Sequence, residues 1–156
     1  MRTTRSLIFN LRLFRQCLLL GFLLTPVMAV GQVPDFEDTL RAAGQGDALA
    51  QYHLGIMYDN GAGVPQDHAE AAKWYRLAAD QGDARALAAL GGMYALGVGV
   101  PRDYVTAYVL LNIAAASGNE DAINARPIVE QQMTGSQVSE AQRLSREIFE
   151  RIQGNQ

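Results

Sequence analysis

The stretch that decides the fold is LGIMYDNGAGVPQD at positions 54–67, which recurs as LGGMYALGVGVPRD at positions 90–103. The two copies lie 36 residues apart without a gap. The two complete units, 46–81 and 82–117, are identical at 16 of their 36 positions. A fixed period of this length is typical of proteins in which small structural units stack on one another. The chain is therefore predicted to be a repeat array.

Each unit is predicted to contain two helices. Gly46 is suited to closing the preceding helix, and Asp47 to capping the next one. The glycines and the proline in 61–65 favour a turn, after which Asp67 caps a second helix and forms a capping box with Glu70. Apolar residues at helical spacing give each helix one buried face. In the first unit these are Ala50, Leu54, Met57 and Tyr58, followed by Ala71, Trp74, Tyr75, Ala78 and Ala79.

The array is predicted to extend beyond its two complete repeats, 46–81 and 82–117. A partial repeat at 36–45 precedes them, and terminal helices over 119–152 follow. Pro127 interrupts the helical pattern, so we expect a kink or a helix start near Arg126. Thr134 and Gln137 form a second capping box ahead of a one-sided terminal helix that covers the open end of the core. Its apolar stripe consists of Val138, Ala141, Leu144, Ile148 and Ile152.

The repeated pattern, at 50–82 and again at 86–118, resembles the Sel-one-like repeat, a relative of the tetratricopeptide repeat. The resemblance covers residues 36 to 133, and the segment from Met133 to Leu144 is similar to the C-terminal helix of short bacterial members. It implies an all-α solenoid of antiparallel helix pairs, wound as a right-handed superhelix with a C-terminal capping helix. It also implies a protein-interaction adaptor, often in the bacterial envelope.

The first 29 residues have the order of a secretory signal peptide. Four arginines precede an apolar run from Cys17, and Ala29 is the preferred last residue before cleavage. Residues 30–35 then form a short linker ahead of the repeat domain at 36–152. The alternative is an uncleaved anchor, although the uninterrupted apolar run is shorter than the ~20 residues that span a membrane. We expect a periplasmic or secreted protein without a membrane span once the leader is removed.

Net charge, cysteine content and length exclude further classes of function. The formal charge of the whole chain is −3, and removing the leader leaves 9 basic and 16 acidic residues, a net charge of −7. Such an acidic chain argues against nucleic-acid binding, which requires clustered lysine and arginine. The only cysteine, Cys17, leaves with the leader. The remaining 127 residues are enough for one domain, which we expect to be a monomer.

No cofactor, metal or catalytic residue is predicted. His53 and His68 lack histidine or carboxylate partners at the spacing of a helical metal site, and Asp67 beside His68 is explained by capping. The glycines of the turns are not followed by the Lys-Ser or Lys-Thr of a phosphate loop. Four serines have no histidine near them in sequence, which argues against a nucleophilic triad. They are Ser117, Ser136, Ser139 and Ser145.

The candidate partner-binding residues are Gln51, Tyr52 and His53, whose counterparts in the second copy are Leu87, Ala88 and Ala89. The first helices of a superhelical array line its concave face, where residues that differ between copies are available to a partner. The other interpretation is ordinary drift between repeats. The predicted function is a non-catalytic protein or peptide adaptor or regulator of the bacterial envelope. The alternatives are a secreted, host-contacting factor and, ranked far below, an envelope hydrolase.

Overall fold

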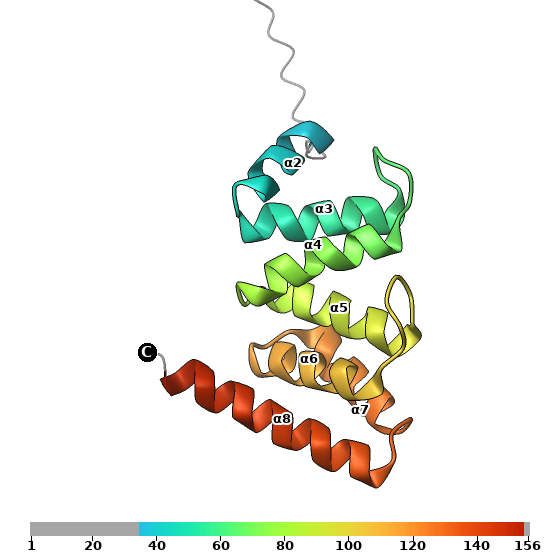
Figure 1. Ribbon diagram of the computed structural model, residues 1–156, viewed down its shortest axis with the longest axis vertical. Coiled ribbons are helices and arrows are strands. Elements are labelled where there is room, and N and C mark those ends of the chain that lie inside the picture. Colours follow the sequence, from blue (N-terminus) through green and yellow to red (C-terminus); the bar gives the residue numbers. More distant parts are fainter. Residues whose placement is uncertain (1–34, 155–156) are drawn as a thin grey trace, which may run out of the picture. The chain divides into compact units, whose positions relative to one another are not determined.

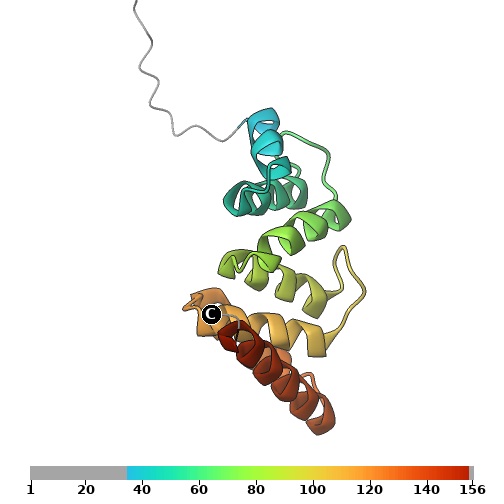
Figure 2. The ribbon, with the colours of Figure 1, turned by 60° about the vertical axis from the view of Figure 1, so that its left-hand side comes forward.

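The computed structural model describes residues 35–154, which contain seven helices and no strand. The predicted signal peptide at 1–29, and the linker up to residue 34, lie outside the described residues. The helices are α2 (Phe36–Gly44), α3 (Ala48–Asn60), α4 (His68–Asp80), α5 (Ala84–Leu96), α6 (Tyr104–Ala116), α7 (Glu120–Glu130) and α8 (Gly135–Gly154). Figure 1 and Figure 2 show α2 to α7 following one another along a stack. The predicted all-α solenoid is confirmed.

The helices pair as the repeat requires. The hairpins α3–α4 and α5–α6 are the two complete units, while α2 occupies the position of a second helix and α7 that of a first helix. The second helix of each unit also packs on the first helix of the next unit, and the buried residues form three clusters that follow one another along the stack. The core is therefore built from contacts between neighbouring units, as in other solenoids.

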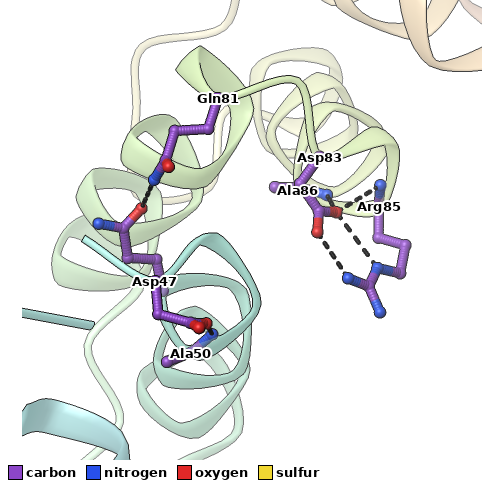
Figure 3. Close-up of polar contacts among 7 residues, drawn as sticks. Asp47, Ala50, Gln81, Asp83, Arg85 and Ala86 are labelled. Atoms are coloured by element: carbon purple, nitrogen blue, oxygen red, sulfur yellow. Dashed lines mark hydrogen bonds and ion pairs between the residues drawn. The ribbon is translucent and has the colours of Figure 1, made fainter. Parts of the chain in front are cut away.

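One glycine and one capping residue form each junction between units. The N–H groups of Gly46 and Asp47 donate to the carbonyls of Ala43 and Ala42, at 3.0 and 3.2 Å, and Gly46 has a φ of 94°. This is the paired hydrogen bonding that ends a helix at a left-handed glycine. The Asp47 carboxylate then accepts the Ala50 N–H at 2.7 Å and starts α3 (Figure 3). The same arrangement recurs at Gly82-Asp83 and at Gly118-Asn119.

The predicted capping box at Asp67 is half formed. The Asp67 carboxylate accepts the Glu70 N–H at 3.0 Å, as expected. The Asp67 N–H, however, donates to the carbonyl of Tyr58 at 2.9 Å, while the Glu70 carboxylate pairs with Lys73 at 2.6 Å. The Asp67 N–H is thus hydrogen-bonded to a backbone carbonyl, and the Glu70 carboxylate forms an ion pair instead of the second bond of the box. The box at Thr134 and Gln137 has both of its bonds, at 2.8 and 3.3 Å.

The repeated Leu-Gly pair allows the two helices of a unit to approach closely. A Cβ atom on Gly55 would lie 2.5 Å from ring carbons of Tyr75, and one on Gly91 would lie 2.9 Å from Cγ of Leu111. Both distances are far shorter than van der Waals contact, so only glycine permits this packing. The glycine is therefore a packing requirement of each hairpin.

The array ends where this pair is lost. In the third unit Arg126-Pro127 takes the place of Leu-Gly, so α7 lacks the glycine that allows close packing in the two complete units. The following helix, α8, instead packs mainly on α6, where its Ala141 and Ser145 are buried. Of the two alternatives expected near Arg126, a kink or a helix start, the helix start is wrong, because Asn119 caps α7 by accepting the Ala122 N–H at 2.9 Å. The helix continues through Pro127 and ends three residues later, at Glu130.

Candidate partner-binding face

The first helices α3, α5 and α7 present equivalent positions to the same side of the array, which we call the first-helix face. It carries residues that are exposed or half-buried and that differ between units. They are Leu49, Tyr52, His53 and Ile56 in α3, Arg85, Ala88, Ala89 and Gly92 in α5, and Asp121, Asn124, Ala125 and Ile128 in α7. This face contains two of the three predicted binding residues.

The structure places Gln51 in the interior, which corrects the expectation that it lies on a binding surface. Its side chain is 5% exposed, and its counterpart Leu87 is also buried. The Gln51 amide donates to the carbonyl of Ala43 at 3.1 Å and accepts from Nε2 of Gln81 at 2.8 Å. Gln81 also donates to the carbonyl of Gly46 at 3.0 Å. Burial of this polar side chain is thus balanced by hydrogen bonds that join two successive junctions.

The Tyr52 side chain of α3 packs against α4 and α5. Its ring centroid lies 5.8 Å from that of Tyr75, and the Arg85 guanidinium carbon lies 4.8 Å above the ring. A guanidinium over an aromatic face is attracted by the ring quadrupole. Tyr52 is half-buried, so packing within the array accounts for most of its contacts.

Arg85 is held in place by Asp83. The two side chains form bonds of 2.6 and 3.2 Å, and the Asp83 carboxylate also accepts the N–H groups of Arg85 and Ala86 (Figure 3). Burial of the Asp83 carboxylate acts to raise its pKa, but the hydrogen bonds from Arg85 and from these N–H groups outweigh it. The pKa of Asp83 is therefore lowered. One aspartate thus starts α5 and orients the cation over Tyr52.

His53 faces a different hollow from Tyr52. A hollow of about 350 Å³ lies between α2 and α3, and its lining includes Thr39, Asp47, Leu49 and His53. The buried Thr39 hydroxyl has no hydrogen-bond partner among residues 35–150. The predicted pair Tyr52 and His53 therefore borders two separate spaces.

A second hollow, which sequence reasoning missed, lies between α5 and α7. Its volume is about 210 Å³, and its floor is formed by small side chains of α5 and α7 together with Leu111 of α6. Arg85, Asn119 and Asp121 border it, and Tyr52 forms one wall. The small residues are Ala88, Ala89, Gly92 and Ala125. The sequence carries a signal for this hollow, because the large residues Tyr52, His53 and Ile56 of α3 are replaced in α5 by the small residues Ala88, Ala89 and Gly92.

His68 and the four serines all form hydrogen bonds within the array. His68 lies 2.7 Å from the Asp59 carboxylate, a contact that joins α4 to α3. The hydroxyls of Ser117, Ser139 and Ser145 donate to carbonyls of their own helices, and Ser136 lies 3.0 Å from the hydroxyl of Thr134. Within the described part of the chain, no three histidine, cysteine or acidic side chains cluster as metal ligands would. None of the helices described there has both the length and the apolar character that a membrane crossing requires.

The class of protein that this architecture defines is the helical-repeat solenoid. Within it, the chain contains two Sel1 repeats, which match residues 48–83 and 84–119. The family predicted from the sequence is thereby confirmed. Proteins of this family are generally modules for protein–protein interaction.

Two solved structures show the same likeness. The chain is similar to c5321, described as a protective antigen present in uropathogenic Escherichia coli strains and displaying an SLR fold. The two share 36% identity with a TM-score of 0.71 over 74% of this chain and 25% of c5321. A Sel1 repeat protein from Oxalobacter formigenes is 43% identical, with a TM-score of 0.58 over 62% of this chain and 27% of its own. The matched region is thus about a quarter of each relative, and no curated protein matches the chain.

Proposed function

We propose that the protein is a non-catalytic adaptor or regulator that binds a protein or peptide of the bacterial envelope on its first-helix face. The observation that carries the proposal is the hollow between α5 and α7. It opens on the face where the repeats differ most, while the repeated residues are used for stacking. A concave, largely apolar space with a few polar groups at its border is the usual form of a ligand site.

The location in the envelope rests on the leader. If the first 29 residues act as a signal peptide, a bacterium that expresses the full chain will export a form that begins at Val30. Intact mass of the exported protein tests this directly. A full-length species that remains in the membrane would contradict both the cleavage and the proposed location.

Site-specific photo-crosslinking tests the binding face. A benzoylphenylalanine at position 89, beside the hollow, is expected to give a discrete crosslinked product in cells that express the full chain. The same group at position 139, on the exposed side of α8, is the matched control. A product from both positions, or only from position 139, would place the partner elsewhere.

A second candidate is a secreted factor that contacts a host. The observation that favours it is the likeness to c5321, which is described as a protective antigen. Fractionation separates the two candidates, since an envelope adaptor stays with the cells and a host-contacting factor reaches the medium or the cell surface.

A further inference from the structure

The intervals between consecutive first helices have equivalent positions along the array, and the first interval is occupied by Tyr52. Between α3 and α5, the ring of Tyr52 lies against Tyr75 of the second helix and under Arg85 of the next first helix. Tyr75 is 3% exposed, so the ring of Tyr52 packs on a buried residue. In this interval an aromatic side chain of the protein itself lies between the two first helices.

The next interval has the same construction without the aromatic ring. Each member of the Tyr52 seat has a counterpart 36 residues later. Tyr52 corresponds to Ala88, Tyr75 to Leu111, Asp83 to Asn119, Arg85 to Asp121 and Ala89 to Ala125. All five counterparts line the hollow between α5 and α7. The hollow therefore exists because Ala88 does not supply the ring that Tyr52 supplies one unit earlier.

The size and lining of the hollow fit such a ring. Its volume of about 210 Å³ exceeds the roughly 150 Å³ that is enough to hold benzene in an apolar cavity. The base is formed by Leu111, which is 1% exposed, and the walls by alanine methyl groups and Gly92. A Cβ atom on Gly92 would meet nothing within 4 Å, so this wall leaves room for an incoming group.

The polar border of the hollow differs from that of the Tyr52 seat at two positions, Asn119 and Asp121, and the second bears on which ring can bind. Asp121 replaces Arg85, so a carboxylate stands where a cation covers Tyr52. A carboxylate accepts hydrogen bonds from phenol O–H or indole N–H groups, which phenylalanine lacks. Tyrosine and tryptophan are also the side chains that most often anchor protein interfaces.

We propose that the hollow between α5 and α7 receives a tyrosine or tryptophan side chain of the binding partner, in the way that Tyr52 fills the preceding interval. This inference rests on the proposed function, because it assigns the chemistry of the partner's anchor. The side chain enters against Leu111 and the alanines, and its O–H or N–H group reaches the border at Asp121.

The test uses N-acetyl-tyrosinamide as the probe and the exported full-chain product as the protein. Methyl NMR should show saturable shifts at Ala88, Ala89 and Ala125 on addition of the probe, because a ring stacked on a methyl group changes its resonance. N-acetyl-leucinamide at the same concentrations should shift them far less. No shifts with the tyrosine probe, or equal shifts with both probes, would overturn the proposal.

Replacement of the missing ring provides the decisive variant. Ala88→Tyr rebuilds the Tyr52 seat within the chain and should weaken probe binding by at least about tenfold. Ala62→Tyr adds the same ring at an exposed turn position and should leave binding unchanged. If Ala88→Tyr does not fold, Gly92→Ile serves instead, since it reproduces Ile56 of the first unit. Unchanged probe binding in a folded hollow-filling variant would exclude the hollow as the site.

The crosslinking assay separates this inference from the proposed function. Ala88→Tyr should abolish the product from position 89 while leaving the protein folded. A product that survives Ala88→Tyr means that the partner does not place an aromatic side chain in the hollow, which overturns the inference and leaves the adaptor function in place. Absence of any product in the wild-type background counts against the adaptor function, while the probe still decides what the hollow accepts.

Discussion

The side-chain amide of Gln81 donates to Oε1 of Gln51 at 2.8 Å, which joins the junction after one unit to the first helix of that unit. Gln51 in turn donates to the carbonyl of Ala43. Gln51→Leu would copy Leu87 of the next unit, yet it leaves the Ala43 carbonyl and the Gln81 amide without these bonds. We expect the free energy of unfolding to fall by about 1 to 3 kcal/mol, the usual cost of a buried polar group left unsatisfied. Urea denaturation measures this, with Gln132→Leu at an exposed site as the control.

Two adjacent glycines in α5 should respond in opposite directions. Gly91→Ala places a Cβ 2.9 Å from Leu111, and we expect a loss of about 1 to 3 kcal/mol through overpacking. Gly92→Ala meets open space and should gain up to about 1 kcal/mol, because alanine favours the helix more than glycine does. Thermal and urea unfolding of both variants give the comparison. Similar effects at the two positions would mean that the close approach of α5 and α6 is not what requires glycine.

The turn between α5 and α6 contacts the start of α4 in the preceding unit at Gly99. A Cβ on Gly99 would lie 2.2 Å from the carbonyl oxygen of His68, at the start of α4, whereas one on Gly63 would lie 3.6 Å from a methyl group of Met57. Both glycines have positive φ, at 69° and 80°, so either replacement by alanine costs about 1 to 2 kcal/mol from the backbone alone. Gly99→Ala should cost at least about 1 kcal/mol more, because the loop must also move away from α4. Equal losses in urea denaturation would exclude the clash as a contributor.

Asp83 should make stability depend on pH in the acidic range. Its folded-state pKa is lowered from an ordinary value of 3.8, so the stabilisation that it contributes is present above that value and is lost as pH falls through the lower folded pKa. Asp83→Asn keeps a capping side chain, as Asn119 provides at the next junction, but removes the charge. Near neutral pH, the free energy of unfolding of the wild type should exceed that of this variant by about 0.3 to 1 kcal/mol.

The comparison of wild type with Asp83→Asn at low pH tests whether the charge of Asp83 is responsible. The difference in unfolding free energy between wild type and Asp83→Asn should shrink progressively as the pH is lowered below 4. Arg85→Gln, which removes the partner of Asp83, should reduce the same difference already at neutral pH. A difference that stays constant from pH 7 to pH 3 would contradict the role of the charge.

Local sequence determines most of this fold, which is why the helices of each unit were predictable. The period exposed the units, and the glycine and aspartate at each junction marked where one helix ends and the next begins. The position of α8 was not predictable in this way. It depends on contacts between residues distant in sequence, since α8 packs mainly on α6 rather than on α7, the helix that directly precedes it.

The candidate site was predictable only in part. The comparison of Gln51, Tyr52 and His53 with their counterparts selected the first helices, because residues not fixed by stacking vary between units. It could not distinguish a buried side chain from an exposed one, and Gln51 proved to be internal. It also directed attention to the large residues, whereas the open space lies over Ala88, where a side chain is missing. Only the arrangement of three helices shows that space.

The junctions have a consequence for how such proteins change in length. Because Gly46-Asp47, Gly82-Asp83 and Gly118-Asn119 form the same bonds, each 36-residue unit is bounded by interchangeable ends. A duplication or deletion of one whole unit therefore leaves every junction intact, while the pair at Arg126-Pro127 fixes the side on which growth stops. Duplication of whole units ahead of that pair would lengthen the array without disturbing a junction, and the matched region is only about a quarter of each longer relative.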